Sequence, residues 1–250
     1  MSIVEYERFA LIYDSDSGEL GQVALALLDV GIDVLYAADP DEAMLLASQE
    51  SGRLGALLTP SSLDPSAFDG LIQRVCPHLA GGIESLLPVG LEPDDEVSSH
   101  LRKHGVRWCL WEPYEARELR FATTAALMAG DPGERRKILR VPAHLFAGML
   151  QGSERRSAVV CDLSAGGAYL GIEPDADAPS FETGSEVDLE LPLQPASIFL
   201  RARVAHTHDS SSPPRADLPG GLGVEFLEMG SADLAALSHL LDDLTRPFRL

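Results

Sequence analysis

The chain reads Arg136-Lys137-Ile138-Leu139-Arg140 and, further on, Asp162-Leu163-Ser164-Ala165-Gly166-Gly167; these two stretches say most about its second half. An arginine guanidinium is a planar fork of donors that fits phosphate oxygens or the O6/N7 edge of guanine. The second stretch adds a carboxylate that can accept hydrogen bonds from guanine N1 and N2, a hydroxyl, and glycines that let backbone approach a ligand. Together the two stretches suit a guanine dinucleotide.

Each stretch alone also has a purely structural explanation. Two arginines four residues apart are typical of a solvated helix face. However, Pro142 disfavours helix at Val141, and no apolar stripe of helical period runs through the segment, so we expect a loop that leads into a strand. Asp, Ser and Gly are also common in tight turns. Ser164 lacks the first glycine and the strand-to-helix setting of a G-x-S-x-G nucleophile, so we expect no catalytic residue and no enzymatic activity.

Taken together, the R-x-x-x-R and D-x-S-x-x-G motifs resemble those of the PilZ domain, a bacterial receptor module for cyclic di-GMP. The resemblance runs from Glu134 to the end of the sequence and includes a late strand, residues 221–226, and a closing helix. It implies an all-β barrel with a C-terminal helix, which binds cyclic di-GMP as a ligand and needs no cofactor.

The resemblance also implies a role for each motif residue. The arginines would hold phosphates and guanine edges, the Asp and Ser would read guanine, and the glycines would permit close approach. An arginine directly before the first motif accompanies binding of a stacked ligand dimer in PilZ domains. The implied ligand-binding residues are Arg135, Arg136, Arg140, Asp162, Ser164, Gly166 and Gly167.

Composition and charge narrow the possible partners. With 250 residues, 45% hydrophobic and 23% charged, the chain can form two ordinary globular domains. The formal net charge of −20 argues against binding DNA or RNA, which would repel it. Residues 1–133 carry 8 Lys and Arg against 22 Asp and Glu, whereas residues 134–167 carry 6 against 3. This basic island coincides with the two motifs, as an anionic ligand requires.

No targeting or membrane-spanning segment is evident. The first seven residues lack a basic region followed by an apolar one, and no apolar run approaches the roughly 18 to 20 residues that span a bilayer. We expect a cytoplasmic protein without a membrane span. Cys76, Cys109 and Cys161 lie in apolar runs without metal-ligand spacing, so we expect buried thiols and no metal site.

The first 128 residues alternate short apolar runs with amphipathic stretches. The apolar runs at residues 9–13, 32–36, 54–58, 86–89 and 106–110 predict strands. Between the first two strands, Leu20, Val23, Ala24, Leu27 and Leu28 predict the apolar face of a helix. Asp39-Pro40 predicts the N-cap and first residue of the next helix. Five β-then-α repeats predict an α/β domain with a flavodoxin-like, doubly wound parallel sheet.

This half resembles a two-component receiver domain that has lost its phosphorylation site. Asp14 matches one metal-binding acid of that family, but Thr59 stands where the phospho-acceptor Asp belongs and Glu112 where the conserved Lys belongs. Asp64 and Asp69 are expected in the loop that follows the third strand, and neither is taken as the acceptor. Such a degenerate receiver implies an interaction module for an unidentified protein partner.

Residues 129–133, Ala-Gly-Asp-Pro-Gly, predict a short linker, which gives domains at 1–128 and 134–250. The strand patterns at residues 157–163, 168–172, 187–191 and 198–204 are short and closely spaced, as in a small barrel. Ser231 is expected to start a helix that covers one mouth of the barrel with Leu234, Leu237, Leu241 and Leu244. The polar loops at residues 173–185 and 208–220 are expected to be mobile.

Two further groups are open to more than one interpretation. His206 and His208 share a strand face, but no third ligand is near in sequence, so an exposed strand end is favoured over a metal site. Trp108, Trp111 and Tyr114 fit either the core or a partner surface.

Three functions fit the sequence. The first is a cyclic di-GMP receptor in which ligand binding changes the arrangement of the domains and partner binding, with an output such as motility or exopolysaccharide regulation. The second is a phosphorylation-responsive regulator with a PilZ output, and the third is a PilZ interaction protein without a ligand. The sequence leaves open whether the chain forms homo-oligomers.

Overall fold

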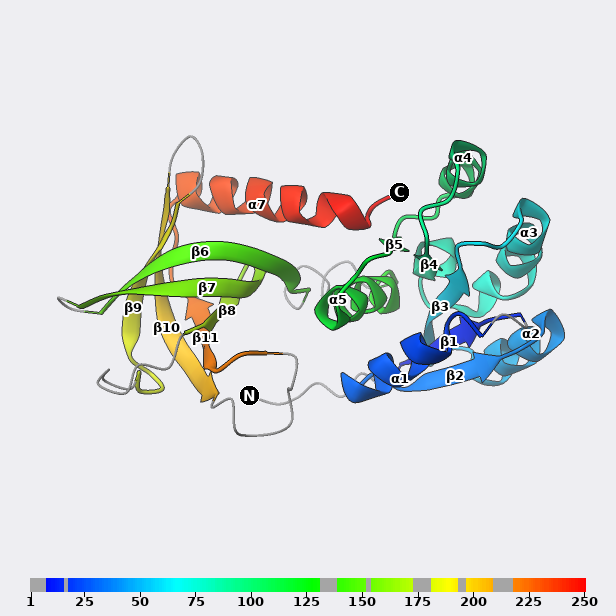
Figure 1. The fold of residues 1–250 in the computed structure, drawn as a ribbon, viewed down its shortest axis with the longest axis horizontal. Coiled ribbons are helices and arrows are strands. Elements are labelled where there is room, and N and C mark those ends of the chain that lie inside the picture. Colours follow the sequence, from blue (N-terminus) through cyan, green and yellow to red (C-terminus); the bar gives the residue numbers. More distant parts are fainter. Residues whose placement is uncertain are drawn as a thin grey trace. The chain divides into compact units, whose positions relative to one another are not determined.

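A computed structural model describes residues 8–15, 18–130, 139–151, 154–172, 181–192, 197–208 and 218–250. The chain divides into two compact units (Figure 1). The first comprises residues 1–135 together with Phe248–Leu250, and the second comprises Arg136–Pro247. The chain therefore passes from the first unit to the second and returns for its last three residues.

The first unit is a five-stranded parallel sheet with helices in its connections. Its strands are β1 (Phe9–Tyr13), β2 (Val34–Ala37), β3 (Leu54–Pro60), β4 (Leu86–Gly90) and β5 (Leu110–Trp111). Its helices are α1 (Gly21–Asp29), α2 (Pro40–Gln49), α3 (Pro65–Arg74), α4 (Asp95–His104) and α5 (Ala116–Leu127), with short 3-10 turns η1 (Cys76–His78) and η2 (Gly82–Ser85). The strand order β2-β1-β3-β4-β5 is the flavodoxin-like order, which confirms the predicted fold class.

Packing on both faces of the sheet explains the continuous apolar runs in the sequence. All seven residues of the central strand β3 are buried. Leu11, Leu57 and Leu86 form one core with apolar side chains of α2, α3 and α4. Figure 1 shows α3 and α5 on opposite sides of the sheet.

The sequence predicted an apolar face for α1. Val23 and Leu27 of that face are buried, whereas Leu28 is exposed, so the prediction is wrong for Leu28.

Three helices of this unit have an aspartate as their N-cap. The Asp39 carboxylate accepts hydrogen bonds from the N–H groups of Asp41 and Glu42, which confirms the predicted N-cap. Asp64 and Asp94 cap α3 and α4 in the same way. Because α3 begins at Pro65, Asp69 lies on a helix and not in a loop, which corrects the prediction.

The predicted fifth strand, residues 106–110, is wrong in extent because part of it pairs elsewhere. Only Leu110–Trp111 pairs with β4. Trp108 forms an antiparallel bridge with Arg249, the Cys109 N–H donates to the Phe248 carbonyl, and the Leu250 N–H donates to Arg107. A segment from the far end of the sequence thus supplies hydrogen-bond partners to backbone groups of residues 107–109. Trp108 itself is buried, so it belongs to the core and not to a partner surface.

The second unit is a closed six-stranded antiparallel barrel with a helix packed on its core. Its elements are β6 (Val141–Gln151), β7 (Glu154–Ser164), β8 (Gly167–Gly171), β9 (Glu186–Leu191), β10 (Ile198–His208), β11 (Gly221–Phe226) and α7 (Ser231–Thr245). The 3-10 turn η3 (Arg246–Phe248) follows α7, and its last residue belongs to the first unit. The order β10-β11-β8-β7-β6-β9 closes through pairing of β9 with β10. This confirms the predicted all-β barrel with a C-terminal helix.

Buried and exposed residues alternate along the strands, and the buried ones point into the barrel core. In β10, Ile198, Leu200, Ala202 and Val204 point into the core and alternate with exposed residues. On α7, Leu237 is buried and Leu241 and Leu244 pack partly against the same core. Leu234 is exposed, contrary to the prediction. The predicted mobile loops, residues 173–185 and 208–220, fall largely outside the described residues.

Candidate functional site

The predicted ligand residues that the structure describes gather where β6 begins and β7 ends. Arg140 directly precedes β6, and Asp162 lies near the end of β7, opposite Pro142 in the strand register. The segment at Arg140 is neither helix nor strand, in agreement with the predicted loop that leads into a strand. Arg135 and Arg136 lie outside the described residues.

Arg140 and Asp162 form an ion pair. Arg140 Nη1 donates to Asp162 Oδ1 over 2.9 Å, and the same oxygen accepts from the Tyr169 N–H over 3.1 Å. The register of β7 and β8 shifts between Val160 and Asp162, as a bulge produces, which leaves the Tyr169 N–H facing the Asp162 side chain. The Asp162 carboxylate is buried, while the Arg140 side chain is partly exposed. The pair therefore has a desolvated anionic end and an accessible cationic end.

The second oxygen of this carboxylate is the unusual feature of the site. Asp162 Oδ2 is buried, and none of the described residues gives it a hydrogen bond. Leaving a buried charged acceptor unsatisfied costs on the order of 1 to 3 kcal/mol or more, so such atoms are rare in folded proteins. A ligand with two neighbouring N–H donors would satisfy this oxygen.

Ser164 and the two glycines shape the hairpin between β7 and β8. The Ser164 hydroxyl donates to the Gly167 carbonyl over 3.0 Å, and the two residues pair across the hairpin. A Cβ on Gly167 would overlap the carbonyl oxygen of Val224 on β11, so this glycine is required for strand packing. A Cβ on Gly166 would meet nothing within 4 Å. Gly166 is thus the glycine beside which a ligand has room.

The basic island is not one patch. Arg155 lies seven residues before Asp162 on β7, which corresponds to roughly 23 Å along a strand. Arg155 pairs with Glu190 over 2.7 Å, and the Arg156 guanidinium lies 5.1 Å from the centre of the Phe181 ring. These two arginines therefore belong to the other end of the strand, and the charge count alone overstated their closeness to the motifs.

In the first unit, the position of a receiver phosphorylation site is occupied by residues that cannot perform that chemistry. Thr59 is fully buried, so its hydroxyl is inaccessible to a phosphoryl donor. Asp14 is buried as well and accepts hydrogen bonds from the Leu20 N–H and the Tyr36 hydroxyl. Burial, reinforced by the Glu112 carboxylate, raises the pKa of Tyr114. Glu112 places an acidic side chain where receivers have a lysine.

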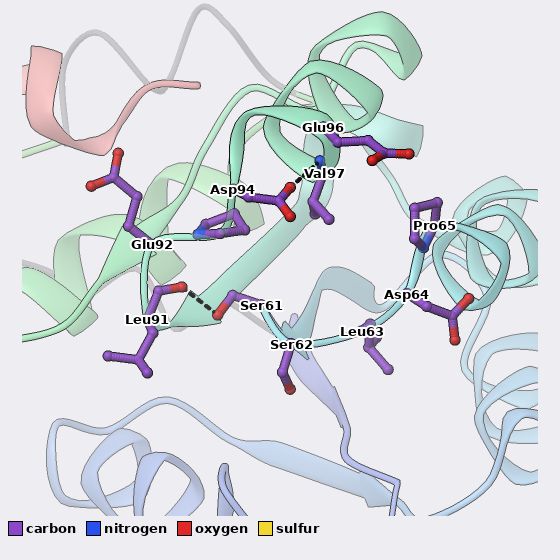
Figure 2. A pocket seen from close by; sticks show the side chains of 11 residues that line it. Ser61, Ser62, Leu63, Asp64, Pro65, Leu91, Glu92, Asp94, Glu96 and Val97 are labelled. Carbon is purple, nitrogen blue, oxygen red and sulfur yellow. Dashed lines mark hydrogen bonds between the residues drawn. The ribbon is translucent and has the colours of Figure 1, made fainter.

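An acidic cleft opens beside this position (Figure 2). It has a volume of about 440 Å³ and is formed by the segments that follow β3 and β4. Ser61, within it, donates to the Leu91 carbonyl over 2.6 Å. Hydrogen bonds from the Ser66 hydroxyl and the Ala67 N–H lower the pKa of Asp64. Among the described residues, the lining contains neither Lys nor Arg and has four carboxylates: Asp64, Glu92, Asp94 and Glu96. Such a cleft repels phosphate.

The remaining candidates have structural roles. Cys76, Cys109 and Cys161 are buried thiols, as predicted. The His206 side chain lies over Gly223, where a Cβ would overlap its ring.

In the part of the chain that the structure describes, every helix is too short or too polar to cross a bilayer. Sequence reasoning missed the cluster of Asp69, His100 and His104, for which the spacing of the two histidines on one helix was the available signal.

Comparisons with solved structures find similar chains for each unit. The PilZ domain of YcgR from Escherichia coli, solved with c-di-GMP, is 18% identical, with 45% of this chain and 93% of that chain covered and a TM-score of 0.37. A response regulator receiver protein from Pseudomonas putida is 23% identical, with 47% and 95% covered and a TM-score of 0.39. The Bacillus subtilis inhibitor of motility MotI is 21% identical, with a TM-score of 0.35; 43% of this chain matches 49% of that one, so the match spans about half of MotI.

No curated protein compared with the chain matches it. The family model of the PilZ domain matches residues 134–243, which include both motifs and all six barrel strands. Residues 134–243 of this chain therefore form a PilZ domain.

Proposed function

We propose that this protein is a non-enzymatic receptor that binds cyclic di-GMP at the start of β6 and the end of β7. The observation that carries the proposal is the buried Asp162 carboxylate, with one oxygen held by Arg140 and the other without a partner among the described residues. A guanine presents N1–H and N2–H donors side by side, and these match an acceptor carboxylate. The PilZ match over the same residues supports this assignment.

The arginines supply the complementary half of the site. Arg140 has an accessible guanidinium next to Asp162, and Arg136 stands four residues earlier in the chain. In the proposed complex these guanidiniums contact phosphate oxygens and guanine O6/N7, while Ser164, Gly166 and Gly167 form the adjoining hairpin. Arg135 contacts a second, stacked ligand molecule.

The decisive experiment is a calorimetric titration of the full chain with cyclic di-GMP, with cyclic di-AMP as the matched control. Adenine lacks the N1–H and the exocyclic N2 donors, so a site built around Asp162 should discriminate strongly between the two ligands. Saturable heat with cyclic di-GMP alone supports the proposal. No heat with either dinucleotide would leave the third hypothesis, a PilZ interaction protein without a ligand. Equal heats with both would contradict recognition of guanine by Asp162.

A further inference from the structure

Three potential metal ligands converge on the surface of the first unit. His100 and His104 are four residues apart on α4 and therefore lie on the same helix face. Asp69 reaches them from α3: its Oδ1 is 2.9 Å from His100 Nε2 and 3.2 Å from His104 Nε2. The ligand atoms all lie within 4.8 Å of one another, and the imidazole ring centres are 4.7 Å apart.

The two distances from Asp69 Oδ1 are close to those between ligand atoms of a zinc site. With Zn–N and Zn–O distances near 2.1 Å, two ligand atoms of a tetrahedral ion are roughly 3.4 Å apart. The two contacts of Asp69 Oδ1 differ from that value by a few tenths of an ångström. Side-chain exposures of 21% for His100, 35% for His104 and 41% for Asp69 leave the cluster reachable from solvent. An ion can therefore enter without opening the fold.

The chemistry of the ligands identifies the class of metal. Two imidazoles and one carboxylate suit Zn²⁺ and neighbouring transition metals, whereas Mg²⁺ and Ca²⁺ prefer sites made only of oxygen. Three protein ligands leave a fourth tetrahedral position for water. We propose that Asp69, His100 and His104 form a Zn²⁺ site that links α3 to α4. This site is separate from the proposed dinucleotide site, which lies in the other unit.

The alternative role for the cluster is a set of hydrogen bonds only, in which both imidazoles donate to one carboxylate oxygen. The two roles differ in a measurable way, because only a metal site responds to added Zn²⁺. The protein is first freed of metal with a chelator and then titrated with Zn²⁺ alone, with Mg²⁺ as a control. We expect one Zn²⁺ per chain from this site, a rise in the melting temperature, and no response to Mg²⁺.

Variants assign the binding to these residues. His100→Ala, His104→Ala and Asp69→Asn should each weaken Zn²⁺ binding at least about tenfold, because losing even an outer-shell partner of a metal ligand costs about that much. His239→Ala removes an exposed helical histidine from the barrel unit and should leave the affinity unchanged. Circular dichroism checks that each variant is folded, and Asp69→Asn retains the shape of the side chain it replaces.

Substitution with Co²⁺ identifies the type of ligand. Visible absorption bands of a four-coordinate Co²⁺ site, without the near-ultraviolet charge transfer that a thiolate would add, support the proposal. Loss of these bands in His100→Ala would place the metal at this cluster. Absence of any Zn²⁺ response in the wild type, or affinities unchanged in both histidine variants, would overturn it.

Discussion

At the scale of single residues, the Arg140–Asp162 pair carries the proposed recognition. Arg140→Ala and Asp162→Ala each remove a charge-assisted contact worth about 1.5 to 3 kcal/mol, so each should lower the affinity for cyclic di-GMP roughly tenfold to a hundredfold. Arg136→Ala should do the same. Titration calorimetry measures the effect. Arg201→Ala is the matched control and should bind like the wild type. It removes an exposed barrel arginine whose Nε lies 3.7 Å from Asp188 Oδ1.

A second residue-scale prediction concerns phosphorylation. Thr59 is fully buried where a receiver carries its acceptor, and the neighbouring cleft is lined by carboxylates that would repel a phosphoryl group. Incubation with acetyl phosphate and Mg²⁺ should therefore leave the mass of the protein unchanged. A gain of one phosphoryl mass within residues 1–128 would revive the phosphorylation-responsive alternative.

The thiols of the first unit predict a dependence of stability on alkaline pH. Burial raises the pKa of Cys76 and of Cys109 to about 12. In the unfolded chain a thiol titrates near 8.5, so between about pH 8.5 and 12 the unfolded state loses protons that the folded state keeps. The contribution of both thiols to stability is complete below that range and is lost as the pH rises through it.

Urea unfolding at a series of pH values tests this linkage. Both tryptophans, Trp108 and Trp111, lie in the first unit, so their fluorescence follows that unit alone. The Cys76→Ala/Cys109→Ala double variant is the control. Tyrosines and lysines also titrate in this pH range, but they do so in the wild type and in the variant alike, so the difference between the two curves reports the thiols. Parallel stability curves for the wild type and the double variant would contradict the assignment.

At the scale of secondary-structure elements, the last three residues pair with the segment that directly precedes β5. Phe248 is buried, with its ring 4.8 Å from that of Phe121 in an edge-to-face arrangement, and its carbonyl accepts from the Cys109 N–H. Phe248→Ala should destabilise the first unit by about 3 to 5 kcal/mol, as buried Phe→Ala changes do. Urea unfolding followed by tryptophan fluorescence measures the change.

Phe146→Ala provides the comparison for this prediction. Phe146 lies on β6 with 76% of its surface exposed, so the same substitution removes little buried area there. Its effect on the stability of the barrel unit should stay within about 0.5 kcal/mol. Urea unfolding of this variant is followed by circular dichroism, because both tryptophans lie in the first unit. If Phe248→Ala were equally mild, the packing of Phe248 on Phe121 would contribute nothing to the unit.

The elements also show how far sequence reasoning reaches. Periodicity located β1, β3 and β4 almost residue for residue, because their apolar runs depend on local burial, whereas β11 came from the family resemblance. It overextended β5, because the partner of residues 107–109 comes from the far end of the chain. The two histidines four residues apart were a signal in the sequence, but the Asp69–His100 contact joins residues 31 positions apart, so only the fold could add Asp69 to them. In the proposed dinucleotide site, the motif named Asp162 but could not show that one of its oxygens is buried without a partner.

At the scale of the whole molecule, the position of Arg135 leads to a prediction of stoichiometry. Arg135 is the last residue before the second unit, directly preceding Arg136. An additional guanidinium can stack on the guanine of a second ligand molecule. We expect two cyclic di-GMP molecules per chain, and Arg135→Leu should lower this number toward one without changing the melting temperature of the free protein. A wild-type ratio of one would exclude the stacked dimer.

The same position suggests how binding could be transmitted between the units, because the boundary between the two units in the sequence lies between Arg135 and Arg136. One ligand molecule held by Arg136 and Asp162, and a second held by Arg135, fix the backbone at this boundary. The new contacts must exceed the cost of about 1 to 2 kcal/mol per ordered residue. Fixing the boundary restricts how the units can be arranged, so saturating cyclic di-GMP should change the small-angle scattering profile of the wild type. The Asp162→Ala variant at the same ligand concentration should show no change. Superimposable wild-type profiles with and without ligand would remove domain rearrangement from the mechanism, while leaving the binding site intact.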